Sequence, residues 1–147
     1  MTIAVDFDGT IVEHRYPEIG EERPFAIDTL KMLIKDRHKL ILWTVRTGDL
    51  LTEAVEWCRQ RGVEFYATNL DFPEEVPEKN PRYSRKLNSI DYFIDDRNIG
   101  GLPDWGTIYR MISHHKSWYD IVAEEVRNAT LQPYEDPREK KKPWWRF

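Results

Sequence analysis

Two carboxylates lie two residues apart in the segment Asp6-Phe7-Asp8-Gly9-Thr10, directly after a short apolar run. Alternate side chains of an extended chain point to the same side, so both carboxylates can face one ligand. Two close carboxylates repel each other, and a hard divalent cation or a shared proton relieves that repulsion. Gly9 permits a sharp turn after them, and Thr10 can satisfy free backbone donors there. The segment predicts a ligand site, and Mg²⁺ is the cofactor that suits its oxygen ligands.

Two later apolar runs also end at a polar residue. Leu40-Ile41-Leu42-Trp43 precedes Thr44, and Tyr92-Phe93-Ile94 precedes Asp95, just as Ile3-Ala4-Val5 precedes Asp6. Continuous apolar runs of this length favour strands of a parallel sheet that is covered on both faces. Any one of the three polar residues, taken alone, is better interpreted as a cap on the next turn. Three together favour a shared site, because ligands bind at the carboxyl ends of parallel strands.

Helical patterns lie between these runs. The apolar residues of 24–37 and of 49–61 recur at helical spacing, with Pro24 suited to a first turn and Gly62 to a helix end. Residues 63–67 predict a short strand, and a late helix is marked by Trp118, Ile121, Val122 and Val126. This alternation predicts an α/β fold, a doubly wound Rossmann-like parallel sheet with helices on both faces.

The composition narrows the class of protein. A chain of 147 residues suits one domain. We expect a core domain over 1–131 and a Pro/Lys/Trp-rich tail over 132–147. The expected docking place of the tail is its own domain, followed in rank by a second subunit and by the mouth of the site. The net charge of -4 makes a nucleic-acid partner unlikely, although the tail interleaves basic with aromatic residues, a pattern that can bind single-stranded nucleic acid. A single cysteine, no membrane-length apolar run and no signal-peptide pattern predict a cytoplasmic protein without membrane contact.

The Asp6 to Thr10 segment resembles the first motif of the haloacid dehalogenase (HAD) superfamily. The run ending at Thr44 resembles the second motif of that superfamily, and Asp95-Asp96 resembles the fourth. Lys86 is the best candidate for the third motif, a lone basic residue before the acidic pair; its rivals are Lys79, Arg82 and Arg85. The matches occur in motif order and span about two thirds of the chain.

This resemblance implies a magnesium-dependent phosphatase. Asp6 would be the nucleophile that forms an aspartyl-phosphate, and Asp8 the general acid/base. Thr44 and Lys86 would bind the phosphoryl group. The metal ligands would be Asp6, Asp8 through its backbone carbonyl, Asp95, and Asp96 through water. Asp8 favours a phosphatase over a dehalogenase, because a halide leaving group needs no proton.

The insertions that carry cap domains in related enzymes are not visible in this sequence. Residues 11–23, here called the flap, and residues 68–85 are long enough only for loops, which predicts a small capless HAD-type phosphatase. Both loops should border the site, and Arg46 is a better candidate for a substrate contact than their charged residues. His114 and His115 are adjacent and cannot act as a paired ligand set, so we interpret them as structural or surface residues.

Two other functions stay open. One is a noncatalytic phosphate-binding or interaction module on the same fold, and the other is a phosphotransferase in which an acceptor hydroxyl replaces water. Asp8 favours an enzyme, because a binding module needs no acid/base residue. The partner is a phosphorylated substrate of unspecified class, and a homo-oligomer is compatible with the sequence.

Overall fold

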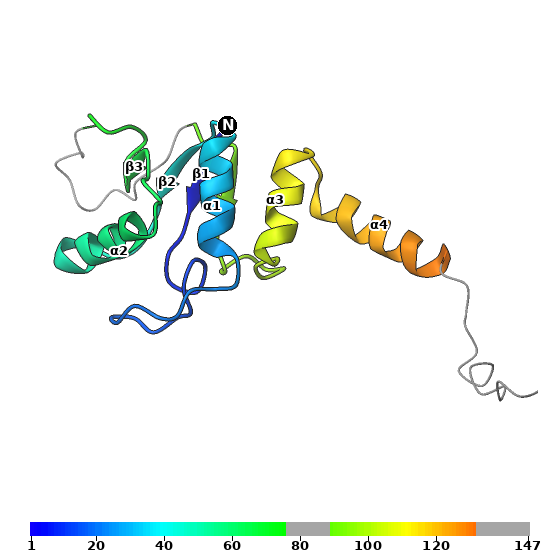
Figure 1. Ribbon diagram of the computed structural model, residues 1–147, viewed down its shortest axis with the longest axis horizontal. Helices are drawn as coiled ribbons and strands as arrows, with labels where there is room; N and C mark the ends of the chain where they lie inside the picture. The colour runs from blue at the N-terminus through cyan, green and yellow to red at the C-terminus, as the bar shows by residue number, and fades with distance from the viewer. Residues whose placement is uncertain (76–88, 132–147) are drawn as a thin grey trace, which may run out of the picture. The chain divides into compact units, whose positions relative to one another are not determined.

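The computed structural model describes residues 1–75 and 89–131 (Figure 1). Within these ranges the elements, in chain order, are β1 (Thr2–Val5), α1 (Ala26–Lys35), β2 (Lys39–Leu42), α2 (Gly48–Gln60), β3 (Ala67–Thr68), β4 (Tyr92–Ile94), α3 (Trp105–Ser113) and α4 (Trp118–Leu131). The chain divides into two compact units, Met1–Tyr109 and Arg110–Phe147. The first unit contains the sheet.

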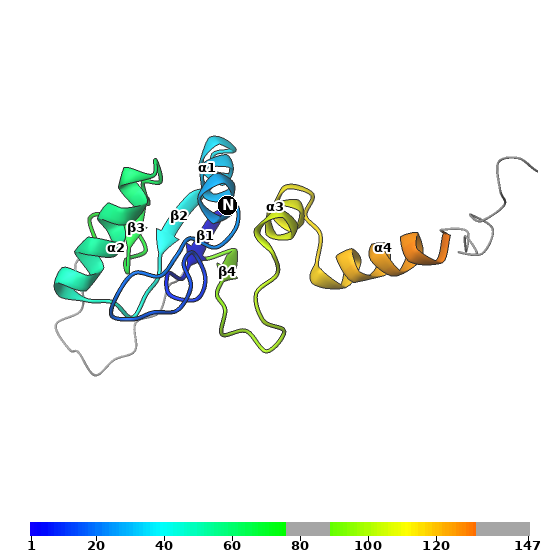
Figure 2. The same ribbon diagram turned by 60° about the horizontal axis from the view of Figure 1, so that its bottom comes forward.

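The sheet has four strands in the order β3-β2-β1-β4, and every pairing is parallel. Figure 2 shows the strands following one another in this order, with β4 beside β1 at the end away from β3. Val5, the last residue of β1, lies opposite Leu42 of β2 and Ile94 of β4. The three predicted apolar runs are therefore neighbouring strands whose carboxyl ends are level. The predicted Rossmann-like parallel α/β fold is confirmed.

The core is built from the apolar runs and from one face of each helix. Residues 3–5 of β1 and 40–42 of β2 are buried. Leu30 and Leu33 of α1 are also buried, as are Ala54 and Cys58 of α2. The predicted helix ends are close to the observed ones: Gly62 has a φ of 85°, and its N–H is hydrogen-bonded to the carbonyl of Arg59. One face of each of these two helices is therefore part of the core that surrounds the central strands.

Two elements differ from the sequence-based expectation. The strand predicted at 63–67 is observed only as Ala67–Thr68, which pairs with Ile41 and Leu42 of β2. Helix α3 was not predicted, although Trp105 and Ile108 lie on its buried face. Its first turn is capped by Asp104, whose carboxylate accepts the N–H of Thr107 at 2.9 Å.

The second unit contains the predicted late helix, α4. Ser117 and Asp120 cap its start reciprocally, since the N–H of each is hydrogen-bonded to the side chain of the other. His114 and His115 lie in the turn before it, outside both neighbouring helices. None of the helices in residues 1–75 and 89–131 has the length and apolar character needed to cross a membrane. The tail over 132–147 lies outside the described residues.

Candidate functional site

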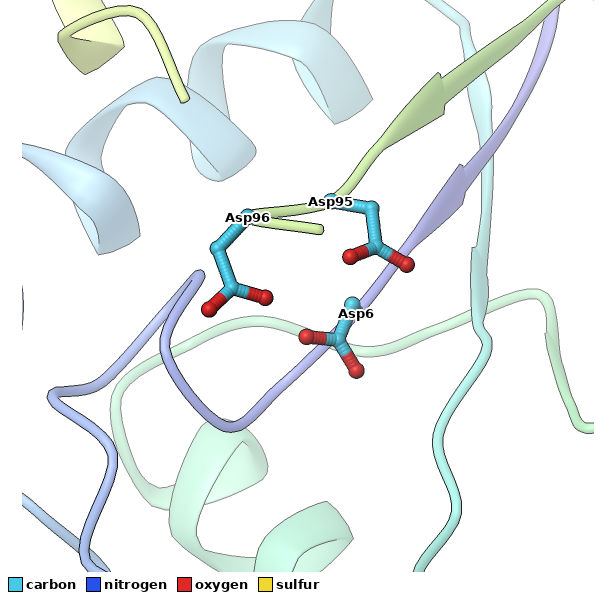
Figure 3. A group of neighbouring side chains, drawn as sticks. All are labelled: Asp6, Asp95 and Asp96. Atoms are coloured by element: carbon cyan, nitrogen blue, oxygen red, sulfur yellow. The ribbon is translucent and has the colours of Figure 1, made fainter. Parts of the chain in front are cut away.

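Three carboxylates meet at the carboxyl edge of the sheet. Asp6 follows β1, whereas Asp95 and Asp96 follow β4. One oxygen from each lies within 4.8 Å of the others, and Figure 3 shows the three side chains turned toward a common space. Strand β2, which follows β1 in the chain, lies along one edge of β1, and β4 lies along the opposite edge of β1. The cluster therefore lies at a topological switch point, where open α/β sheets bind their ligands.

The hydroxyl of Thr10 joins the two halves of this cluster. Its Oγ1 donates to Asp6 Oδ2 at 2.9 Å and accepts the backbone N–H of Asp96 at 3.0 Å. Thr10 is fully buried, and the indole Nε1–H of Trp105 donates to its carbonyl oxygen at 3.1 Å. Asp95 is oriented separately, because its Oδ1 accepts the N–H of Arg97 at 2.8 Å. The carboxylates of Asp6 and Asp95 are therefore oriented by hydrogen bonds within the protein itself.

The electrostatics of the cluster suit a hard cation. The pKa of Asp6 is raised from 3.8 to about 6: burial is the largest cause, the hydrogen bonds from Thr10 and from the Phe7 backbone oppose the rise, and the charges of Asp95 and Asp96 add to it. Asp96 Oδ1 is buried and has no hydrogen-bond partner within the described ranges. A divalent cation held by oxygen ligands would satisfy this oxygen and stabilise the ionised carboxylates together. The three aspartates could therefore hold a metal ion.

Gly9 makes the close approach of Asp96 possible. It has a φ of 88°, a conformation that residues with a Cβ rarely adopt. A Cβ at this position would lie 2.2 Å from Asp96 Oδ2. Glycine is therefore required both by the turn after the two carboxylates and by the space that Asp96 occupies.

The Asp8 carboxylate is paired with Arg46. Arg46 Nε donates to Asp8 Oδ2 and Nη2 donates to Oδ1, both at 2.7 Å. Arg46 is fully buried and Asp8 is 8% exposed, and hydrogen bonding to Asp8 raises the pKa of the arginine. Among the described residues the metal-competent group is Asp6, Asp95 and Asp96, without the Asp8 side chain. A metal contact through the Asp8 backbone carbonyl stays a prediction.

Arg46 also contacts the flap. Its Nη1 donates to the carbonyl of Pro17 at 3.0 Å, and its Nη2 donates to the carbonyl of Glu18 at 2.9 Å. The guanidinium carbon lies 5.3 Å from the centre of the Tyr16 ring. An open cavity of about 580 Å³ is lined by His14, Arg15, Tyr16 and Glu18. The flap therefore borders a cavity whose wall is tied to Asp8 through Arg46, and Arg46 itself is buried rather than presented to a substrate.

The turn after β2 presents Thr44 at the same edge of the sheet. The N–H of the preceding Trp43 is bonded to the carbonyl of Val5, which continues the strand pairing. The Thr44 N–H donates to Asn69 Oδ1 at 2.8 Å, and Thr44 Oγ1 accepts the N–H of Arg46 at 3.2 Å. This second bond uses a lone pair of the hydroxyl rather than its proton. Lys86 and its rivals Lys79, Arg82 and Arg85 lie outside the described residues.

A solved structure of a conserved protein from Bacteroides thetaiotaomicron is similar to most of this chain. The two are 64% identical, the match covers 82% of this chain and 96% of that one, and the TM-score is 0.73. This chain belongs to the family of that Bacteroides protein. No family model matches the sequence, and neither does any curated protein.

Two site residues of this chain have roles that the sequence did not reveal. Thr10 links Asp6 to Asp96, whereas the sequence predicted only that it satisfies backbone donors. Arg46 pairs with Asp8, whereas the sequence predicted a substrate contact. Its position two residues after Thr44 at the end of a central strand is the signal that places it near the ends of β1.

Proposed function

We propose that this protein is a magnesium-dependent phosphohydrolase of the HAD type, which removes the phosphoryl group of a phosphomonoester. The carrying observation is the cluster of Asp6, Asp95 and Asp96 at the switch point of a parallel sheet. The resemblance of the Asp6 to Thr10 segment to the first HAD motif gives the cluster its chemical role. Bound Mg²⁺ would be held by these carboxylates and would neutralise charge on the phosphoryl oxygens.

Asp6 is the proposed nucleophile. Its Oδ2 is fixed by the Thr10 hydroxyl, so the direction of the whole carboxylate is set. Attack on phosphorus forms a bond between an Asp6 oxygen and phosphorus and breaks the bond to the leaving oxygen, which gives an aspartyl-phosphate. Water then attacks phosphorus, releases inorganic phosphate and regenerates Asp6. Two easier displacements replace a single difficult one.

Asp8 and Thr44 assist these steps. Asp8 would enter the first displacement carrying a proton on an oxygen lone pair that Arg46 leaves free, give that proton to the leaving oxygen, and take one back from the attacking water in the second. Thr44 donates its hydroxyl proton to a phosphoryl oxygen. The orientation of that hydroxyl is supported by the bond it accepts from the N–H of Arg46. Lys86 is the proposed second phosphate-binding residue.

The flap takes the place of a cap domain beside the reacting groups. Residues 6–25, between β1 and α1, are described throughout and contain no helix or longer strand. The cavity lined by His14, Arg15, Tyr16 and Glu18 is the proposed space for the leaving group. Its lining offers an aromatic face together with charged side chains, which suits a polar small molecule better than an apolar one.

The test is phosphate release from p-nitrophenyl phosphate and from a panel of sugar phosphates, nucleotides and phosphopeptides, with Mg²⁺ or with EDTA. Turnover that needs Mg²⁺ and is abolished by Asp6→Asn is the expected result. Asp28→Asn is the matched control, since Asp28 is exposed on α1 and should leave turnover unchanged. Retained turnover in Asp6→Asn would refute the nucleophile. Magnesium-dependent binding without turnover of any ester would favour a binding module, and transfer to an added alcohol would favour a phosphotransferase.

A further inference from the structure

We propose that Arg46 is a positioning residue, which holds the Asp8 carboxylate and the Tyr16–Glu18 part of the flap in one fixed arrangement. The inference rests on the proposed function, because it gives Arg46 a role in the proton transfers assigned to Asp8. It concerns a residue that touches neither the phosphoryl group nor the carboxylate cluster in that mechanism. It also explains what fixes the flap beside Asp8.

The first observation is the completeness of the contacts around the guanidinium. Arg46 is fully buried, and its Nε, Nη1 and Nη2 atoms make four hydrogen bonds to three residues, Asp8, Pro17 and Glu18. Its carbon lies 5.2 Å from the centre of the Phe7 ring and 5.3 Å from that of Tyr16. A planar guanidinium that is hydrogen-bonded through all three of its nitrogens and lies near two aromatic rings has little freedom to rotate. Arg46 therefore holds the Asp8 carboxylate and the carbonyls of Pro17 and Glu18 in one orientation.

The second observation is that these contacts connect two parts of the proposed site. Asp8 belongs to the turn after β1, whereas Pro17 and Glu18 belong to the flap, and Arg46 follows β2. The backbone N–H of Arg46 also donates to Thr44 Oγ1. One residue therefore relates the proposed acid/base, the cavity wall and the proposed phosphate-binding hydroxyl. Each Asp8 oxygen keeps a second lone pair beside the one that Arg46 occupies, so the pairing orients the carboxylate without using its full capacity.

The third observation is energetic. A buried ion pair contributes little to stability compared with apolar side chains of similar volume, so stability alone is a weak reason for placing Arg46 here. The positions of the flap carbonyls depend on it, because both of its flap bonds go to backbone oxygens. A lysine has one compact charge and cannot reproduce the fork. The geometry therefore predicts separate effects on flap anchoring and on the rate of the chemical step.

Flap anchoring can be measured without any enzyme activity. Trypsin cleavage after Arg15, which is exposed in the flap, is compared with cleavage after Lys35 in α1, which requires that helix to open. We expect the ratio of the two rates to rise at least about tenfold in Arg46→Ala and by less in Arg46→Lys. Arg59→Ala, which removes an exposed arginine that is paired to Glu56 by the same kind of fork, should leave the ratio unchanged. An unchanged ratio in both Arg46 variants would overturn the flap part of the proposal, whether or not the protein is a phosphatase.

Positioning of Asp8 is tested by kinetics with p-nitrophenyl phosphate. A misplacement of about 1 Å can reduce a rate about 10²-fold, so Arg46→Ala should lower kcat by about that factor while KM stays within about threefold. Guanidinium chloride at millimolar concentration should restore at least about tenfold of the lost rate in Arg46→Ala, whereas urea should not. If Arg46→Ala is not folded, Arg46→Lys should show an intermediate loss of kcat at unchanged KM. A loss confined to KM, or wild-type kcat in the folded variants, would overturn the positioning role, whereas an inactive wild-type protein would overturn the proposed function itself.

Discussion

Burial, rather than geometry, should decide how strongly two forked ion pairs in the described part of the chain, Arg46 with Asp8 and Arg59 with Glu56, are coupled. Arg46 pairs with Asp8 through two bonds of 2.7 Å, and Arg59 pairs with Glu56 through two bonds of 2.8 Å. The side chains of the first pair are 0% and 7% exposed, whereas those of the second are 58% and 42% exposed. At about 4 Å between charges, an effective dielectric constant near 20 gives about 4 kcal/mol, and the value in bulk water is about a quarter of that. The two pairs therefore share the forked geometry and differ strongly in burial, and a double-mutant cycle cancels the other contacts of each residue.

A double-mutant cycle measures this coupling. Arg46→Met should lower the free energy of unfolding by about 3 to 5 kcal/mol, because it leaves a buried carboxylate without its partner. Adding Asp8→Leu should recover a large part of that loss, since apolar side chains can replace a buried pair. The same cycle with Glu56→Leu and Arg59→Met should give at most about a quarter of the coupling. Urea unfolding followed by circular dichroism supplies the four free energies of each cycle, and equal coupling in both pairs would refute the reasoning.

The further predictions concern three residues, Asp6, Gly9 and Cys58. The raised pKa of Asp6 means that protons compete with the cation, so Mg²⁺ affinity measured by calorimetry should fall as the pH is lowered through about 6. Protonated Asp6 stabilises the folded protein fully below its ordinary pKa of 3.8, and this stabilisation is lost as the pH rises through about 6. In EDTA, the Tm of Asp6→Asn minus the Tm of wild type should therefore increase over that pH range. Gly9→Ala should lower both Tm and Mg²⁺ affinity, because its Cβ would meet Asp96, whereas Gly48→Ala should lower only Tm, by the strain of a φ of 56°, since a Cβ there meets nothing within 4 Å in the described part of the chain. Cys58, buried and with its pKa raised to about 12, should resist a thiol reagent such as Ellman's reagent until the protein unfolds. Contrary results would be, in turn, a Mg²⁺ affinity independent of pH, a difference in Tm between Asp6→Asn and wild type that does not change with pH, an equal loss of Mg²⁺ affinity in both glycine variants, and rapid labelling of the native protein.

Local pattern and topology were enough to predict the sheet and the meeting of Asp6 with Asp95. Apolar runs indicate buried strands, and parallel strands joined by helices must place their carboxyl ends at one edge. Asp6 and Asp95 directly follow paired strands, so their proximity needs no knowledge of side-chain packing. Helix α3 could also have been predicted from Asp104, Trp105 and Ile108, whose spacing marks a capped helix with one buried face.

The role of Arg46 could not be predicted in the same way. Arginine is mostly exposed, and nothing local indicates that one will be buried. Its contacts lie 28 to 38 residues away and depend on the path by which the flap returns to the sheet. The shift of β3 to Ala67–Thr68 has a related cause, because strand pairing decides the position of this edge strand and burial of Val63 alone does not.

The central claim is that Asp6 forms a covalent phosphoryl intermediate. The most direct test is to mix the protein with Mg²⁺ and a phosphomonoester that it turns over, quench within the first turnover, and reduce with borohydride, which converts an acyl phosphate of aspartate to homoserine. Mass spectrometry of the peptide containing Asp6 and Asp8 should find homoserine at Asp6, only when substrate and Mg²⁺ are both present. Homoserine at Asp8 or elsewhere, or turnover without any reduced residue, would contradict the account.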